Sequence, residues 1–426
     1  MLSAADADLV QREKALAGMA TVLDPDAFVK ALRTARPDLI IADAQLSYIR
    51  YRPTRYCLGA YRIRTGNGVL LLGHITAYSA KAWTKLACSA DEHHVVVRDE
   101  TLISLFPGDT KLPSLAPLMN GDGRQTIMNT LLPGNAVDWS HDIETLAYKP
   151  ERRYVGKIGN NGNFAILKHY RKSEYHNAAL AAKAGGSSSG RLQIPRVLGQ
   201  SERHQCQVIE WLPGRSLASE VNTAPEPGAL YGVGEALAEF QTLPSEGLPE
   251  RSGDMEIRKL HSMADTIALL HPPLASLARR LAGAIAEKLS RAPPAGCRLH
   301  GDFHPGQVIL TDDRRAAFID LDESARGHPL TDLGMFIAYL HDYQFRTPAL
   351  SAQTAPLLIE ALLEGYQNAT QGKVTDSLRY YVAVGLFSLT HNPFRSHAPA
   401  WPEKTHAMLE RIHDILHSPD LVSSRL

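Results

Sequence analysis

Residues 299–323 read Leu-His-Gly-Asp-Phe-His-Pro-Gly-Gln-Val-Ile-Leu-Thr-Asp-Asp-Arg-Arg-Ala-Ala-Phe-Ile-Asp-Leu-Asp-Glu, and this stretch decides the fold. Two short apolar runs, residues 308–310 and 316–319, flank a polar segment, which is typical of an antiparallel β-hairpin. Gln307 comes just before the first strand and Asp320 just after the second. We therefore expect both side chains to lie together at the open end of the hairpin.

An amide and a carboxylate that converge in this way form a hard-oxygen site of the kind that Mg²⁺ prefers. Asp302 lies in the loop that leads to the same end, and it could accept a proton without binding the metal. Asp322 follows Asp320 closely; if the strand continues, the two carboxylates share one face and Asp322 helps to hold the metal. Phosphoryl transfer requires this layout, in which a metal neutralises phosphate charge and a carboxylate orients the attacking hydroxyl.

A phosphate anchor and a nucleotide hinge are expected upstream of the hairpin. Lys168 ends an apolar strand, and Glu174 on the following helix is its expected ion-pair partner. Residues 208–214, Val-Ile-Glu-Trp-Leu-Pro-Gly, read as a strand that leads into a hinge. Exposed backbone groups near Glu210 and Leu212 could hold an adenine there.

The motif His-Gly-Asp-x-His-Pro-Gly-Gln at residues 300–307, followed by Ile-Asp-Leu-Asp at 319–322, resembles a known pair of motifs. They are the catalytic and metal motifs of the aminoglycoside phosphotransferase and choline kinase-like superfamily. The resemblance covers about residues 148–410 and implies a bilobal, protein-kinase-like fold. It also implies ATP and Mg²⁺ as cofactors and a small-molecule hydroxyl as the phosphate acceptor, with GTP open as the alternative donor.

The same resemblance implies a role for each matching residue. Asp302 would be the catalytic base, Asp320 the Mg²⁺ ligand and Lys168 the anchor of the ATP phosphates. His300 and Asp332 would support the catalytic loop. Each of these residues stands at the position that the motif requires.

Gln307 departs from the pattern, because the superfamily usually has Asn there. The maltokinase-like bacterial sugar and aminosugar kinases look similar in using Gln, and they carry an extra N-terminal cap region. This favours a sugar, aminosugar or aminoglycoside-like acceptor. An aminoglycoside would need acidic residues in the pocket, and candidates are Glu323, Asp342 and Glu403. Each of these can equally be a solvated surface acid. The alternative is a catalytically inactive pseudokinase that binds a nucleotide or a protein partner.

Two other interpretations of the motif are weaker. His300-x-Asp302-x-His304 could be a transition-metal triad, but no further ligand follows at a suitable spacing. His304 is counted among the candidate catalytic residues, although a histidine there can also bond the backbone. A protein kinase is disfavoured because Asp-Phe-Gly and Ala-Pro-Glu are missing after Asp320.

The upstream region contains an apparent internal duplication. One β-hairpin motif recurs at a constant offset of 97 residues, as Tyr51, Pro53, Arg55 and Gly59 and again as Tyr148, Pro150, Arg152 and Gly156; coincidence between two hairpins is the alternative. The first copy has Gly73 or His74 where the second has Lys168, so it should not bind ATP productively. The segment Gly-Asn-Asn-Gly at residues 159–162 either covers the phosphates or forms a plain turn.

These patterns predict an α+β protein with a small antiparallel β-rich N-lobe, a mostly helical C-lobe and an extra N-terminal cap domain that resembles a duplicated N-lobe. The predicted domains are 1–145 (cap, mixed α/β), 146–212 (N-lobe) and 213–426 (C-lobe). Predicted local features are short helices over 1–45 with Asp24 as a cap, a strand over 48–63, an Asn67-Gly68 turn, and helices over 173–183 (capped by Ser173), 229–242, 274–289 and 376–417.

Composition narrows the partners of this 426-residue chain. Lys plus Arg and Asp plus Glu are 45 each, so a basic nucleic-acid footprint is not expected. No apolar run is long enough for a membrane span and no leader is expected, so we predict a cytoplasmic protein. The sparse cysteines fit a reducing compartment. The expected partner is a small hydroxyl substrate. The N-terminal region is expected to cap the small lobe, to stiffen the nucleotide site or to add a surface for a homodimer.

Overall fold

The computed structural model describes the chain except residues 85, 87–90, 135–138, 140, 161–162, 187, 224–225, 294–295, 347–349, 351–352 and 419–426. Of the cysteines, Cys57, Cys206 and Cys297 are free thiols, and Cys88 lies outside the described residues. The phosphate-covering role considered for residues 159–162 falls partly outside them as well. No helix in the described part of the chain is long and apolar enough to cross a membrane.

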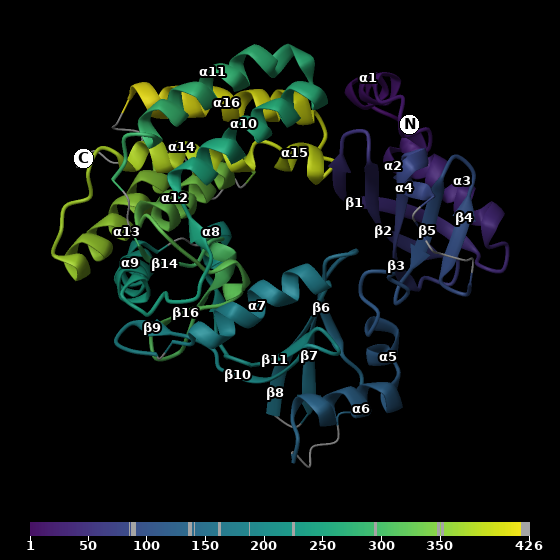
Figure 1. Cartoon of the computed structure of the whole chain (residues 1–426), viewed down its shortest axis with the longest axis horizontal. Coiled ribbons are helices and arrows are strands. Elements are labelled where there is room, and N and C mark those ends of the chain that lie inside the picture. The colour runs from purple at the N-terminus through teal and green to yellow at the C-terminus, as the bar shows by residue number, and fades with distance from the viewer. Residues whose placement is uncertain are drawn as a thin grey trace.

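The N-terminal unit is a five-stranded antiparallel sheet with helices packed against it (Figure 1). The strand order is β1-β2-β3-β5-β4. The elements are α1 (Ala4–Arg12), α2 (Met19–Leu23), α3 (Pro25–Ala35), β1 (Ile41–Arg52), β2 (Tyr56–Thr65), β3 (Leu70–Tyr78), α4 (Ala80–Trp83), β4 (His94–Val97) and β5 (Thr101–Leu105).

The N-lobe is a second five-stranded antiparallel sheet, of order β6-β7-β8-β11-β10. Helices α5 and α6 share an apolar core with this sheet. The elements are α5 (Leu115–Met119), α6 (Gly121–Leu131), β6 (Glu144–Lys149), β7 (Arg153–Asn160), β8 (Asn163–Tyr170), α7 (Lys172–Ala184), β10 (Val197–Ser201) and β11 (Cys206–Glu210).

The C-lobe is built around the largest apolar core and carries two small sheets. Its helices are α8 (Leu217–Thr223), α9 (Pro227–Gln241), α10 (Gly253–Leu270), α11 (Ala275–Leu289), α12 (Leu330–Gln344), α13 (Thr354–Thr370), α14 (Leu378–Leu389), α15 (Asn392–Arg395) and α16 (Trp401–His417), with 3-10 turns at Pro272–Leu274, Pro305–Gln307 and Leu321–Glu323. Its strands are β9 (Leu192–Gln193), β12 (Arg215–Ser216), β13 (Glu250–Arg251), β14 (Cys297–Leu299), β15 (Val308–Leu310), β16 (Ala316–Phe318) and β17 (Ala325–Gly327).

The α+β fold class and the decisive hairpin are confirmed. β15 pairs antiparallel with β16, with Val308 opposite Phe318. Asp24 caps α3 by accepting a hydrogen bond from the N–H of Asp26, as its position before a proline predicted. Ser173 is not a cap, because α7 begins one residue earlier and Arg171 occupies the N-cap position.

The expected single strand over residues 48–63 is wrong, and the reason supports the duplication. The chain turns between β1 and β2, where Thr54 has a φ of 58°, and Glu151 at the matching β6–β7 turn has a φ of 57°. Both sheets run in the same strand order. In the first sheet Thr76 lies opposite Leu58, at the position that Lys168 occupies in the second. The counterpart of the lysine is therefore Thr76 rather than Gly73 or His74.

The N-terminal unit contacts both lobes, with α15 on one side and the β6–β7 turn on the other. On the C-lobe, Trp401 donates from Nε1 to Asp6 at 3.1 Å and packs within the apolar core of the unit. On the N-lobe, Arg50 forms an ion pair with Glu151 at 2.5 Å, and the Tyr78 hydroxyl donates to the same carboxylate at 3.1 Å. The unit therefore links the two lobes.

Buried histidines should make the fold sensitive to mild acid. Burial lowers the pKa of His341 to about 4 and that of His391 to about 3. Histidines in the unfolded chain titrate near 6.5, so below that pH the unfolded state binds protons that the folded state does not. The free energy of unfolding should fall between pH 7 and pH 5 by up to about 1.4 kcal/mol per pH unit for each histidine.

Urea unfolding at pH 7.5, 6.5 and 5.5 measures this slope. The His341→Gln variant should show a shallower slope than the wild type. A wild-type stability that is constant or rises towards pH 5.5 would contradict the expectation.

Candidate active site

The catalytic loop begins at His300, directly after β14, and is fixed from two sides. The backbone N–H groups of His300 and Gly301 donate to the two carboxylate oxygens of Asp332 at 2.7 and 3.0 Å. The imidazole of His300 donates from Nε2 to the carbonyl of Ile319 at 2.9 Å. The loop is therefore held both to α12 and to the end of the β15–β16 hairpin, while the catalytic part expected for it stays a prediction.

Gly301 brings this loop against the turn that follows Asp320. Its φ is +86°, and a Cβ at this position would lie 2.0 Å from the carbonyl oxygen of Glu323. Only glycine satisfies both conditions. The close approach places the two acidic segments of the site next to each other.

Asp302 projects into the cleft, with 46% of its side chain exposed. The nearest basic group is His304 Nε2, at 3.9 Å. His304 accepts the N–H of Gly306 at Nδ1 and stacks on Tyr339, and burial lowers its pKa to about 4. Because His304 is thus neutral near pH 7, it positions the loop without forming an ion pair with Asp302.

The open end of the hairpin brings Gln307 and Asp320 together as predicted. The N–H of Ile319 donates to the carbonyl of Gln307 at 3.0 Å, and the Gln307 amide donates to Asp320 Oδ2 at 3.1 Å. Asp320 itself is left-handed, with a φ of 62°. The strand does not continue beyond Asp320. The 3-10 turn that follows, Leu321–Glu323, brings the carboxylate of Asp322 next to that of Asp320.

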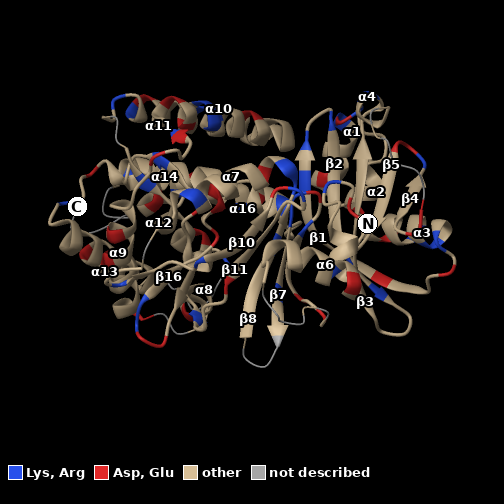
Figure 2. Ribbon diagram, turned by 60° about the horizontal axis from the view of Figure 1, so that its bottom comes forward, with Lys and Arg blue, Asp and Glu red and all other residues tan. Residues whose placement is uncertain are grey.

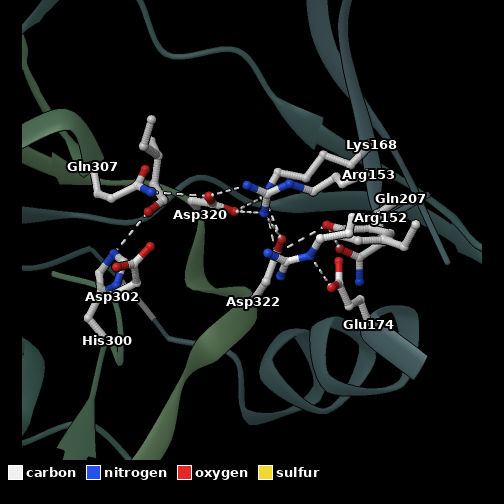
Figure 3. A network of polar contacts seen from close by, with 12 residues as sticks. Arg152, Arg153, Lys168, Glu174, Gln207, His300, Asp302, Gln307, Asp320 and Asp322 are labelled. Atoms are coloured by element: carbon white, nitrogen blue, oxygen red, sulfur yellow. Dashed lines mark hydrogen bonds and ion pairs between the residues drawn. The ribbon is translucent and has the colours of Figure 1, made fainter. Parts of the chain in front are cut away.

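Two N-lobe cations meet these two carboxylates across the cleft (Figure 3). Lys168 Nζ lies 2.7 Å from Asp320 Oδ1 and 3.1 Å from both oxygens of Asp322. Arg153 contacts both oxygens of Asp320, at 2.7 and 2.9 Å, and reaches Asp322 at 2.8 Å. The hydroxyl of Tyr170 also donates to Asp322. We call Lys168, Arg153, Asp320 and Asp322 the interlobe cluster.

Electrostatics keep this cluster charged although it is almost buried. Burial acts to raise the pKa of Asp320, but Lys168 and Arg153 outweigh burial and hold it well below its usual range. Burial acts to lower the pKa of Lys168, and the two carboxylates reverse that effect and raise it. The pKa of Asp322 is raised by burial and by its neighbour Asp320. The result is a strongly ionised acid held by two cations.

The expected ion pair between Lys168 and Glu174 is wrong. Glu174 instead contacts Arg152 at 2.6 Å and Arg171 at 3.0 Å, since it lies in the first turn of α7 beside the β6–β7 turn. Lys168 reaches across the cleft to the two aspartates instead. The sequence reasoning missed Arg153; its position directly after the repeated Tyr-x-Pro-x-Arg motif was the available signal.

The two hinge residues lie apart from these groups. The carboxylate of Glu210 forms an ion pair with Arg196 at 3.0 Å, and the backbone N–H of Glu210 donates to the backbone carbonyl of Arg196 at 2.9 Å. Leu212 follows the end of β11. That these residues hold an adenine stays a prediction. The contact would be made by the backbone groups that follow β11.

A cavity of about 760 Å³ joins the catalytic loop to the hairpin end. This is within the range of ligand pockets in proteins. Asp302, Gln307 and Asp320 line one part of it, and helices of the C-lobe line another. Tyr48 reaches it from β1 of the N-terminal unit. The cavity therefore has room for a small molecule next to the carboxylate of Asp302.

The oxygen atoms at the hairpin end fit a hard cation. Asp320 is strongly ionised, and the Asp322 carboxylate and the Gln307 side-chain amide lie against the same group. These are donors that Mg²⁺ accepts. Within the described ranges, no set of three or more His, Cys, Asp or Glu side chains is arranged to hold a metal, so the His300-x-Asp302-x-His304 triad receives no support.

Replacement of Asp332 should destabilise the loop that begins at His300. It is 1% exposed, and removing its carboxylate in Asp332→Ala leaves two backbone N–H groups without an acceptor. We expect a loss of about 3 kcal/mol in the free energy of unfolding, and a smaller loss in Asp332→Asn, which keeps one oxygen. Urea unfolding measures both; equal stability of Asp332→Ala and the wild type would contradict the role.

Three comparisons place the chain among known proteins. A model of the phosphotransferase enzyme family matches residues 140–380, which is more than half of the chain. The comparison with curated proteins finds no match. A protein of Ralstonia eutropha JMP134 described as an aminoglycoside phosphotransferase superposes with a TM-score of 0.50 at 16% identity, covering 71% of this chain and 97% of that one.

Two further solved structures have lower scores. A choline/ethanolamine kinase family protein of Mesorhizobium loti gives a TM-score of 0.49 at 18% identity, covering 71% of this chain and 96% of that one. A spectinomycin phosphotransferase in complex with ADP gives 0.48 at 12% identity, with coverage of 70% and 98%. At 16% identity the likeness to the Ralstonia protein concerns the fold alone, and it confirms the expected bilobal, protein-kinase-like architecture.

Proposed function

Because this chain belongs to the phosphotransferase enzyme family, we propose that it is an ATP-dependent kinase that phosphorylates a hydroxyl of a small sugar-like metabolite. The observation that carries this proposal is the interlobe cluster. Lys168 and Arg153 come from the N-lobe sheet, Asp320 and Asp322 come from the C-lobe hairpin, and Asp302 lies in the adjoining cavity. A phosphate anchor, an acidic metal site and a base thus converge on one cleft.

In this proposal the residues divide the work of direct in-line transfer. Asp302 orients the acceptor hydroxyl and takes its proton as the oxygen bonds to the γ-phosphorus. The bond between that phosphorus and the β-phosphate oxygen breaks, and ADP leaves with the electron pair. Lys168 and Arg153 bind phosphate oxygens. A Mg²⁺ ion held by Asp320 and Gln307, with Asp322 beside them, would neutralise phosphate charge.

The alternative function is nucleotide binding without turnover. The specific observation in its favour is that Arg153 already contacts both oxygens of Asp320. In a pseudokinase this pairing would persist when a nucleotide binds. In the active enzyme Arg153 would exchange the carboxylate for phosphate.

Replacement of Asp302 tests the catalytic assignment. In Asp302→Asn the side chain keeps its size but cannot take the proton, so kcat should fall about 10²- to 10⁴-fold. The dissociation constant for MgATP, measured by calorimetry, should change by less than about threefold, because Asp302 has no predicted phosphate contact. Asp313→Asn, in the exposed hairpin turn, is the matched control. Unchanged turnover in Asp302→Asn would remove the residue from the mechanism.

Gln307 tests the metal assignment. Gln307→Asn retains an amide oxygen, whereas Gln307→Leu removes it with little change in volume. The Mn²⁺ dissociation constant in the presence of ADP, measured by electron paramagnetic resonance, should rise at least about tenfold in Gln307→Leu and much less in Gln307→Asn. Equal affinities in the wild type and Gln307→Leu would show that this side chain does not hold the metal.

A further inference from the structure

Basic side chains of three C-lobe helices line the cavity that Asp302 also lines. Lys259 on α10, Arg395 on α15 and Lys404 on α16 border the same cavity as Asp302. We call these three the acceptor-side cations. Figure 2 shows Lys and Arg segments, together with Asp and Glu segments, in the region between the C-lobe helices and the N-terminal unit. In the part of the chain that the structure describes, none of the three forms an ion pair with a carboxylate.

Arg395 is held in place without neutralisation of its charge. One guanidinium nitrogen donates to the Tyr48 hydroxyl at 2.8 Å and another to His391 Nε2 at 2.9 Å. His391 is neutral, since burial, Arg395 and Lys259 lower its pKa to about 3. Neither partner is a carboxylate, so neither forms an ion pair with Arg395. A fixed guanidinium of this kind suits a carboxylate or a phosphate, which it can bind with two hydrogen bonds.

Lys259 also lacks a counter-ion of its own. The nearest acid on its helix, Glu256, is already paired with Arg251 at 2.5 Å. Loss of hydration and the charge of Arg251 lower the pKa of Lys259, and they outweigh the opposite effect of Glu256, Glu323 and Asp302. A lysine in this position gains stability when an anion binds next to it.

The acids expected for a cationic acceptor do not offset this charge. Asp342 lines the cavity but is paired with Arg346. Glu323 is exposed at the rim, and Glu403 is exposed and is not among the residues that line the cavity. A polyamine-like acceptor would thus meet three cations of the cavity wall that form no ion pair with a carboxylate of the described residues.

The phosphates of ATP do not account for the acceptor-side cations. In the proposed function the nucleotide is held by Lys168 and Arg153, which belong to strands β8 and β7 of the N-lobe. The acceptor-side cations come from three helices of the C-lobe, and Tyr48 positions one of them from the N-terminal unit.

We propose that the acceptor carries an anionic group, a carboxylate or a phosphate, which Lys259, Arg395 and Lys404 bind while its hydroxyl lies at Asp302. This deepens the proposed function and rests on it. Tyr48 is a positioning residue that acts through Arg395, so the N-terminal unit takes part in choosing the acceptor.

A matched set of hexoses tests the proposal. Glucose, glucuronate, glucose 6-phosphate and glucosamine share one ring and differ in charge. Calorimetric titration of each into the protein with saturating MgADP should give at least about tenfold tighter binding for one anionic sugar than for glucose, and the weakest binding for glucosamine. Comparison of glucuronate with glucose 6-phosphate shows whether the preferred anion is a carboxylate or a phosphate.

Single substitutions show which residues bind the anionic group of the sugar. Arg395→Gln and Lys259→Gln should each weaken binding of the preferred anionic sugar at least about tenfold and leave glucose binding within twofold. Tyr48→Phe removes only a hydroxyl and should raise the KM for that sugar about threefold to fivefold at constant kcat. Lys288→Gln, which removes an exposed charge on α11, is the control and should change nothing.

The proposal is overturned if glucosamine binds as tightly as the anionic sugars, or if neither anionic sugar binds more tightly than glucose. It is equally overturned if Arg395→Gln and Lys259→Gln bind the preferred sugar like the wild type. Failure of the proposed function has a different signature: the wild type would then bind no MgATP in a separate titration.

Discussion

The interlobe cluster is the interaction on which the rest of the site depends. Two carboxylates of the C-lobe hairpin and two cations of the N-lobe sheet meet almost out of contact with water. Each group is tolerated there only because its partners are present, since an unpaired buried charge is strongly destabilising. A metal–triphosphate complex could replace both sets of partners at once, because the metal satisfies the carboxylates and the phosphates satisfy Lys168 and Arg153. The charges of the cleft would therefore suit the ligand that we propose.

The N-terminal unit repeats the strand order of the N-lobe, but its sheet has Thr76 where the N-lobe has Lys168. Without that cation it lacks the phosphate anchor that we propose for Lys168. Its β1 strand brings Tyr48 to Arg395 in the cavity, and its contacts with Glu151 and Trp401 connect the two lobes. The part in the site that we propose for the unit rests on these contacts.

The parts of the site that depend on local sequence could be predicted. Gln307 and Asp320 flank one short hairpin, so strand pairing alone brings them together. The partners of Lys168 could not be predicted in this way. Asp320 is 152 residues away from Lys168 in the sequence. Asp322 comes close to Lys168 because Asp320 adopts a left-handed backbone conformation, which has no sequence signature here. The contact between Tyr48 and Arg395 spans 347 residues and joins units that no periodicity relates. Such pairings follow from the packing of whole units and not from any one motif.

The central claim is that the interlobe cluster binds the phosphates of a nucleoside triphosphate. A crystal structure with Mg²⁺ and a non-hydrolysable ATP analogue tests it most directly. The account predicts Asp320 and Gln307 on the metal, with Lys168 and Arg153 moved from the carboxylates to phosphate oxygens. A structure in which the analogue binds elsewhere, or in which Arg153 stays on Asp320 beside the bound analogue, would contradict it.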